Sequence, residues 1–336
     1  MNTPILSIFP LGFPWQTQDP FLFCVYHLDQ YPKGNPDMTP AASLEGRNLG
    51  NDFTGKDGWR MYHGQTVPGF PAHPHRGFET VTIVNKGYCD HSDSLGAAGR
   101  FGEGDVQWMT AGKGVQHCEM FPLLNTDSGN PLELFQIWLN LPKKDKFATP
   151  YFAMLWHEDI PVIKTKNASV KIVAGTYAGS KAPEPAPDSW AADPKNEVAI
   201  WNVHINADAE FILPKANGKV NRTLYFYEGD TILIAGKEVI KNNGVELDSA
   251  QDISIRASGK SAHLLMLQGK PIAEPVVQHG PFVMNTSDEI QEAMKEYRST
   301  QFGGWPWLQL DQVHPREQGR FAKYPDGKVT IKNMEV

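Results

Sequence analysis

Cysteine is scarce in this chain. Only three cysteines, Cys24, Cys89 and Cys118, occur among the 336 residues. They form no Cys-x-x-Cys motif and their number is odd, a usage that fits a reducing compartment. Cys118 lies between two residues of a candidate metal motif described below. Alternation along a strand would turn its side chain away from that motif, so we expect a packed thiol at this position and not a ligand.

Long apolar runs are also missing. No stretch approaches the roughly 20 apolar residues that a membrane-spanning helix requires. The first residues, Met1 to Phe13, contain no Lys or Arg, and Pro4 and Pro10 interrupt their apolar content. This segment therefore lacks the charged and apolar regions of a secretory signal. The sequence predicts a cytoplasmic protein without a membrane association.

Positive charge is not in excess. The formal net charge is -7 and the isoelectric point is near 5.9. The densest basic run, residues 143–146, is short and is interrupted by Asp145. A chain with this balance has no general attraction for phosphate backbones, so direct nucleic-acid binding is not expected. Its length and its 40% hydrophobic content suit about two globular domains.

Two pairs of potential metal ligands are the most informative feature that is present. His73 and His75 are two residues apart and precede the β-branched, alternating segment 78–84. His117 and Glu119 repeat the same spacing about forty residues later. On a strand, side chains at i and i+2 leave the same face, so each pair could reach one ion.

Three imidazoles and one carboxylate suit a first-row divalent metal, with Fe, Ni, Mn, Cu and Zn all acceptable. Four protein ligands would leave two positions of an octahedral ion open to small molecules, as in a reactive centre. Spacing alone does not identify the carboxylate. If the strand after His75 is regular, Glu79 lies on the same face as His75, so both Glu79 and Glu119 remain candidates.

The order of the predicted elements indicates two β-barrels. Strands are expected at 21–28 and 132–141, and the first barrel at 1–150. A second barrel is expected at 160–300, opening with a strand at 171–175. When Gly87 is set against Gly229 without gaps, Lys215 and Asn217 stand where His73 and His75 do. We therefore expect no metal ligands in this second domain.

A short helix is expected near the C-terminus. Thr286 and Glu289 form a capping-box pattern, and apolar residues follow at helical spacing until Gly303–Gly304. Residues 301–336 are expected to form an irregular strap over the surface. Four of the other histidines, His27, His63, His91 and His263, are interpreted as structural or exposed.

Several segments resemble the signature of the pirin family within the cupin superfamily. The similar segments are His73–Thr82, Gly104–Gly114, His117–Met120 and Glu274–Thr286. The resemblance implies an all-β fold of two tandem cupin (jelly-roll β-barrel) domains with a short C-terminal helix. It also implies one metal, usually iron, bound by the residues that match the family ligands: His73, His75, His117 and Glu119. Glu79 would then be a supporting residue outside the ligand set, for example as an ion-pair partner of Arg76.

The resemblance also implies a function. Some pirins are quercetin 2,3-dioxygenases, so a metal-dependent dioxygenase acting on a small aromatic or enolisable substrate and O2 is expected. Glu119 would accept the proton of the substrate hydroxyl. The alternative is a non-catalytic iron-binding regulator, because other pirins modulate transcription or a partner enzyme. A regulatory protein partner belongs to this alternative.

Overall fold

The computed structural model describes residues 3–333 and consists almost entirely of β-strands. The chain divides into two compact units, here called the first and the second barrel. The first barrel comprises residues 26–136, 143–157 and those from 274 onward; the second comprises those up to 25, 137–142 and 158–273. The predicted fold, all-β with two cupin domains and one short helix, is confirmed.

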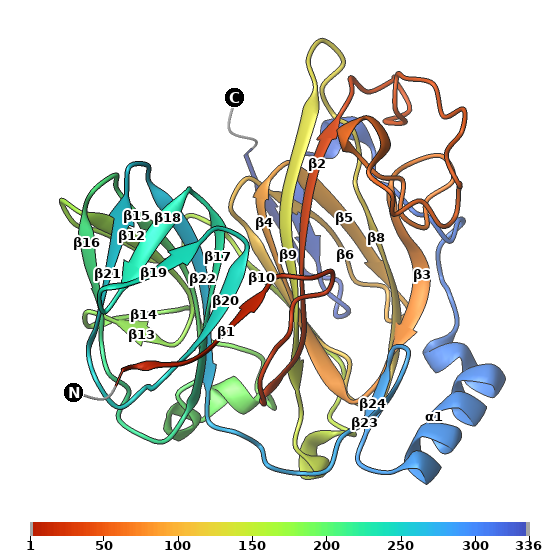
Figure 1. The fold of residues 1–336 in the computed structure, drawn as a ribbon. Helices are drawn as coiled ribbons and strands as arrows, with labels where there is room; N and C mark the ends of the chain where they lie inside the picture. The colour runs from red at the N-terminus through yellow and green to blue at the C-terminus, as the bar shows by residue number, and fades with distance from the viewer. Residues whose placement is uncertain (1–2, 334–336) are drawn as a thin grey trace. The chain divides into compact units, whose positions relative to one another are not determined.

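The first barrel is built from two antiparallel sheets around a core of aromatic and aliphatic side chains (Figure 1). One sheet has the order β10 (Tyr151–Leu155), β7 (Val106–Thr110), β4 (Phe78–Lys86), β9 (Asn130–Asn140) and β2 (Phe21–Tyr31). Of the last two strands, residues 130–136 and 26–31 belong to this unit. The other has the order β26 (Val329–Lys332), β25 (Arg320–Lys323), β6 (Ala98–Gly102), β5 (Tyr88–Asp93), β8 (Val115–Met120) and β3 (Gly69–His75). Strand β4 is buried from Phe78 to Val84, which suits its β-branched sequence.

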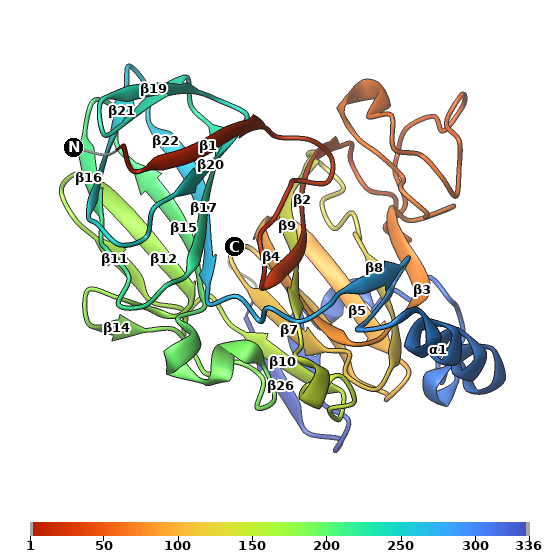
Figure 2. The same ribbon diagram turned by 60° about the horizontal axis from the view of Figure 1, so that its bottom comes forward.

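The second barrel also consists of two main sheets (Figure 2). The larger has the order β1 (Ile5–Pro10), β20 (Asn243–Leu247), β17 (Asn221–Glu228), β22 (Ala262–Gly269), β15 (Ala199–Ile205), β12 (Ala168–Ala174) and β11 (Val162–Lys164). The smaller has the order β16 (Glu210–Leu213), β21 (Ile253–Ser258), β18 (Thr231–Ile234) and β19 (Lys237–Ile240), and a hairpin joins β13 (Thr176–Tyr177) to β14 (Ser180–Lys181). Aliphatic side chains of both sheets form one continuous core.

A short hairpin, β23 (Val277–His279) and β24 (Phe282–Met284), leads into the helix α1 (Ser287–Thr300), as Figure 1 shows. The predicted capping box is present, because Thr286 and Glu289 each accept a hydrogen bond from the other's backbone N–H. The helix ends at Thr300, before the predicted glycine stop. Short 3-10 turns lie at Lys56–Gly58, Lys143–Asp145, Trp190–Ala192, Pro194–Asn196, Gln301–Gly303 and Arg316–Gln318. No helix within residues 3–333 is long and apolar enough to cross a membrane.

The compact units differ from the boundaries predicted at 150, 160 and 300. Strand β1 pairs with β20, so the N-terminal segment belongs to the second barrel. Strand β25 pairs with β6, so the segment after residue 274 belongs to the first barrel. Local hydrophobic pattern predicts that a strand exists but does not identify its distant partner. For this reason the sequence alone did not indicate which barrel each terminal segment joins.

Candidate metal centre

Strand β8 carries the candidate site, because its neighbours on both sides place polar residues beside it. On β3, one neighbour of β8, His73 is the register partner of His117. On β5, the other neighbour, Asp93 is the register partner of His117, and His91 is the register partner of Glu119. Directly opposed residues on neighbouring strands have their side chains close together on one face. The pairing of β3, β8 and β5 therefore concentrates imidazoles and carboxylates inside the first barrel.

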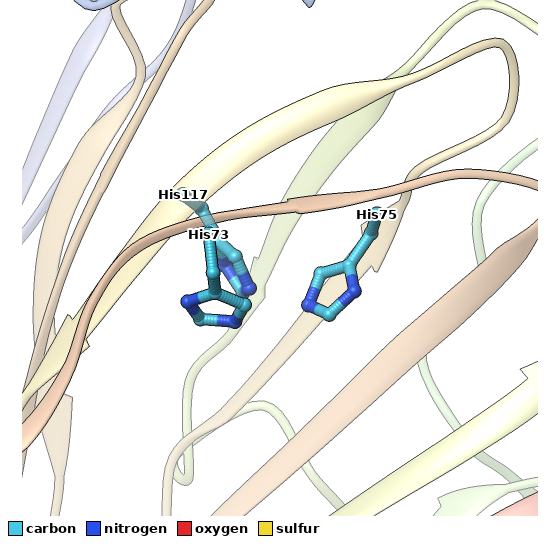
Figure 3. Close-up of side chains that lie close together, drawn as sticks. All are labelled: His73, His75 and His117. Atoms are coloured by element: carbon cyan, nitrogen blue, oxygen red, sulfur yellow. The ribbon is translucent and has the colours of Figure 1, made fainter. Parts of the chain in front are cut away.

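The imidazoles of His73, His75 and His117 converge. Their potential ligand nitrogens all lie within 4.8 Å of one another. Figure 3 shows the three rings facing a shared space, with His73 and His75 extending from one strand and His117 from its neighbour. Ligand nitrogens about 2.1 Å from an ion lie about 3 to 4 Å apart. The three predicted histidines are thus brought together at a spacing that one ion can bridge.

For two of the three histidines, His73 and His117, a hydrogen bond sets which ring nitrogen carries the proton. Nδ1 of His73 lies 2.9 Å from the carbonyl oxygen of Pro71 and donates to it. Nδ1 of His117 lies 3.4 Å from Nδ1 of His91. Both contacts leave Nε2 as the nitrogen with a lone pair, and Nε2 of His117 is buried without a hydrogen-bond partner among residues 3–333. A buried nitrogen in this state fits a metal ligand.

His91 is a site residue that the sequence interpretation missed. Its Nε2 lies 3.2 Å from Oδ2 of Asp93, and it donates its proton there, so Nδ1 is left to accept from His117. Oδ1 of Asp93 is fixed by the backbone N–H groups of Leu95 and Ala97 at 2.9 Å each. Groups behind a ligating imidazole commonly fix its tautomer and orientation in this way. The signal was available, because His91 and Asp93 have the same two-residue spacing as the predicted ligand pairs.

Glu119 leaves the same face of β8 as His117, although its carboxylate is not part of the group of ligand atoms within 4.8 Å of one another. Its Oε2 lies 3.8 Å from Nε2 of His117, a distance that suits two ligands of one ion. The hydroxyl of Thr82 donates to Oε1 at 3.1 Å, and the amide of Gln136 donates to Oε2 at 2.9 Å. Burial raises the pKa of Glu119, while the nearby His91 and these two hydrogen bonds act in the opposite direction. The carboxylate is held in place and its basicity is increased.

The three imidazoles are neutral at pH 7. Burial lowers the pKa of His73 to about 4, and it lowers the pKa values of His75 and His117 well below their ordinary range. For His75, a hydrogen bond with the Pro281 backbone opposes this effect. A metal ligand must be the neutral imidazole, so the environment prepares all three residues for binding. The donor set therefore fits a divalent ion.

The other candidate carboxylate, Glu79, lies in a different environment. The strand expected to continue from His75 ends there, and β4 begins at Phe78 after Gly77, whose φ of 87° breaks the regular alternation. The assumption of one continuous strand was therefore wrong. Alternation along β4 places Glu79 on the face opposite Thr82, which contacts Glu119.

The hydrogen bonds of Glu79 come from the far side of the sheet. Its Oε1 accepts hydrogen bonds from the Trp108 indole at 3.1 Å and the Thr110 hydroxyl at 2.7 Å. The carboxylate partner of Arg76 is Glu296 of α1, at 2.8 Å. The ion pair expected between Arg76 and Glu79 is thus replaced by one between Arg76 and the C-terminal helix.

The first part of the C-terminal strap, residues 305–313, lies on the outer face of β8, whereas the expected irregular structure is replaced further on by strands β25 and β26 beside β6. Trp305 and Val313 pack against Cys118 and its apolar neighbours. Cys118 alternates along β8 with His117 and Glu119, so its side chain points away from the candidate site. The expectation of a packed thiol at this position agrees with its complete burial in this cluster. The strap therefore supports the outside of the sheet that carries the site.

Fold and site together define a cupin protein whose first barrel carries a candidate metal centre. A sequence pattern described as "Pirin" matches residues 45–139, and one described as "Pirin C-terminal cupin domain" matches residues 200–303. Pirin of Rattus norvegicus is 31% identical over 266 residues, which cover 72% of this chain and 80% of that protein. The chain belongs to the pirin family.

Two further relatives carry the name of an activity. A Pseudomonas aeruginosa protein named as a candidate quercetin 2,3-dioxygenase is 34% identical over 237 residues, or 70% of this chain and 79% of its own length. The crystal structure of a quercetin 2,3-dioxygenase from Acinetobacter baumannii superimposes with a TM-score of 0.72 at 25% identity. The match covers 90% of this chain and 99% of the Acinetobacter chain.

Proposed function

We propose that this protein is a metal-dependent dioxygenase of the quercetin 2,3-dioxygenase type, which opens a flavonol-like ring with O2. The observation that carries the proposal is the convergence of three neutral imidazoles within 4.8 Å, beside the buried carboxylate of Glu119. The similarity to proteins named for this activity supports the same reaction type. Fold similarity alone would not assign a substrate, so the proposal rests on the site.

In this proposal His73, His75, His117 and Glu119 hold one divalent ion, which we propose to be Fe2+. The same donor set also accepts Ni, Mn, Cu or Zn. The bound ion would supply Lewis-acid and redox chemistry toward an enolisable hydroxyl group and O2. The ligand tautomers need no rearrangement, because hydrogen bonds from Nδ1 already leave Nε2 of His73 and His117 facing the site.

Glu119 is the proposed proton acceptor. Burial raises its pKa, so its carboxylate is a stronger base than one in water. The hydrogen bonds from Thr82 and Gln136 hold both of its oxygens in place. A substrate hydroxyl that comes within hydrogen-bond distance of Glu119 would lose its proton there, and the resulting oxyanion is the electron-rich form that reacts with O2.

Buried polar groups of the first barrel that lack hydrogen-bond partners favour a polar substrate. Gln107 is the register partner of Thr82, so both share one face of the sheet. Both side-chain amide atoms of Gln107 and the hydroxyl of Thr80 are buried without hydrogen-bond partners among residues 3–333. Buried polar groups in this state are costly unless a ligand or water satisfies them. A molecule with several hydroxyl groups would provide those partners.

Oxygen uptake with quercetin tests the proposal. The protein would be reconstituted anaerobically with Fe2+, checked for metal content, and compared with His73→Ala and with His204→Ala. His204 lies on β15 of the second barrel and serves as the matched control. We expect uptake and a ring-cleaved product from the wild type and from His204→Ala, and neither from His73→Ala.

The regulatory alternative predicts a different outcome. No uptake at full iron occupancy would contradict the dioxygenase proposal and favour an iron-binding regulator that acts on a partner protein.

We also propose a cytoplasmic location, since Cys24, Cys89 and Cys118 are all free thiols in the structure.

A further inference from the structure

The second barrel contains a cavity of about 340 Å³. Small apolar residues, among them Ala174, Ala182 and Pro183, form part of its lining, together with a few polar side chains. The volume lies at the lower end of the range for small-molecule pockets, about 300 to 1,000 Å³. Every lining residue belongs to the second barrel, so the cavity is a feature of that unit alone.

Arg222 is a buried charge in the lining. It lies on β17, where it is the register partner of Gln268 on β22, and it is only 2% exposed. Its Nε and Nη2 donate to Oε1 of Gln268 at 2.8 and 2.6 Å, which fixes the guanidinium. The Gln268 amide in turn donates to the carbonyl oxygen of Glu197 at 3.1 Å. Nη1 of Arg222 is left without a hydrogen-bond partner among residues 3–333.

Trp201 is a second lining residue with a donor that has no hydrogen-bond partner. It lies on β15, next to β22 in the sheet, and is 4% exposed. Its indole Nε1 is buried without a hydrogen-bond partner within residues 3–333, while its ring packs edge-on against Tyr177. Two buried N–H donors without acceptors around one cavity are unusual, because native proteins satisfy nearly all such groups.

None of the acidic residues of the lining accepts a hydrogen bond from Nη1 of Arg222 or from the Trp201 indole within residues 3–333. Glu184 pairs with Lys181 at 2.5 Å, and both are exposed. Asp193 accepts from the backbone N–H of Lys195 at 2.9 Å, as the N-cap of a 3-10 turn. Glu197 accepts from the backbone N–H of Asn217 at 2.9 Å. The unsatisfied buried groups of the cavity are therefore all donors.

The lining of this cavity includes the segment that aligns in sequence with the first ligand pair of the candidate metal centre. In the register that pairs Gly87 with Gly229, Lys215 and Asn217 correspond to His73 and His75. Both Lys215 and Asn217 line the cavity. Unlike His73 and His75, which lie on β3, both residues are exposed in the loop between β16 and β17. Lys215 thus adds an exposed cationic group to the lining, and Arg222 adds a buried, fixed one. Cationic donors select an anion where neutral imidazoles select a metal.

We propose that this cavity binds a small organic carboxylate. The carboxylate oxygens accept hydrogen bonds from Nη1 of Arg222 and from the indole N–H of Trp201, and an apolar body of the size of one ring occupies the space beside the alanine and proline residues. An arginine supplies a fixed planar donor that matches carboxylate geometry. This site is separate from the proposed dioxygenase reaction, and its existence does not depend on that reaction.

Binding of benzoate to the full-length, metal-loaded protein tests the site. The indole N–H signals are recorded by ¹⁵N NMR, and Trp201→Phe identifies the signal of Trp201. We expect benzoate to shift that signal, and benzamide, its neutral analogue, to bind at least about tenfold more weakly. Calorimetry should show the affinity for benzoate reduced about tenfold or more in Arg222→Gln and severalfold in Trp201→Phe.

Arg256→Gln is the matched control, since Arg256 is an exposed arginine on β21 of the same barrel. It should bind benzoate as the wild type does. If Arg222→Gln does not fold, Arg222→Lys keeps the charge without the planar donors and should still weaken binding.

Two results would overturn the proposal. One is a Trp201 signal that does not move with benzoate, hexanoate or acetate up to about 10 mM, a concentration that saturates even millimolar sites. The other is binding that is unchanged by Arg222→Gln, Arg222→Lys and Trp201→Phe, or equally strong for benzamide. Oxygen uptake with quercetin is measured on the same variants, so failure of this site and failure of the dioxygenase proposal are distinguished.

Discussion

Nδ1 of His91 lies 3.4 Å from Nδ1 of His117, and Nε2 of His91 lies 3.2 Å from Oδ2 of Asp93. These contacts form a chain of three side chains that ends at Nε2 of His117 in the candidate site. The strap reinforces it, because the ring of His314 donates to the His91 carbonyl oxygen at 2.9 Å. The orientation of one candidate ligand is therefore determined by residues that would not touch the ion.

We predict that His91→Phe weakens metal binding by about 10- to 100-fold, the usual effect of removing a group that orients a ligand imidazole. The phenyl ring retains the stacking of His91 on Phe152 but cannot accept the His117 proton. Competition with a metal-binding dye measures the affinity. His279→Phe is the control, since His279 is exposed in β23. An unchanged affinity in His91→Phe would show that Asp93 and His91 do not act on the site.

Glu119→Gln and Glu79→Gln separate the two candidate carboxylates. We expect Glu119→Gln to lower the metal content and abolish ring cleavage, because a neutral amide is a poor ligand and a poor base. We expect Glu79→Gln to keep the ion, since the amide oxygen can still accept from Trp108 and Thr110. Metal analysis after gel filtration measures both. Loss of the ion in Glu79→Gln with retention in Glu119→Gln would reverse the assignment.

Stability should fall in acid partly because of His27. Burial, assisted by the charge of Arg60, lowers the pKa of His27 to about 3. In the unfolded chain the pKa is near 6.5, so below that pH the unfolded state takes up the proton first. The free energy of unfolding therefore decreases as the pH falls from about 6.5 toward 3, by at most about 1.4 kcal/mol per pH unit from this residue.

His27→Gln should flatten this decrease, because the amide can donate to Tyr62 in place of Nδ1 without titrating. Urea unfolding of wild type and variant at pH 7, 6 and 5 measures the slopes. Identical slopes in His27→Gln and the wild type would contradict the assignment of this proton to His27.

The three cysteines should be unreactive in the folded protein. Cys24, Cys89 and Cys118 are each fully buried, and burial raises the pKa of every one of these thiols. Thiol reagents react with the thiolate, so neither access nor ionisation favours labelling. We expect no reaction with a chromogenic disulfide reagent in native buffer and full reaction in guanidinium chloride. Rapid native labelling of any one cysteine would show that its segment opens.

Local patterns predicted the elements of the first barrel well. The two-residue spacing in His73–His75 anticipated that both rings leave one face, and the structure places them with His117. The capping box at Thr286 was also predictable, because its two hydrogen bonds are made within four residues. Both features depend on the geometry of a single strand or helix turn, which sequence spacing encodes directly.

Features that depend on distant pairing could not be predicted in this way. Glu79 does not share the face of His75, because Gly77, with a φ of 87°, ends the regular strand where the chain packs against the backbone of Val283. The partner of β1 is β20, more than two hundred residues away, and no local pattern identifies it. The cavity around Arg222 likewise depends on the register of β17 against β22. These features are set by tertiary packing and not by propensity.

The central claim is that His73, His75, His117 and Glu119 hold one ion in the first barrel. Anaerobic titration with Fe2+, followed by metal analysis and X-ray absorption at the iron edge, tests it most directly. The account predicts one equivalent per chain with imidazole and carboxylate ligands, lost in His73→Ala and His117→Ala and retained in His204→Ala. Full iron occupancy with an unchanged absorption spectrum in both ligand variants would contradict it.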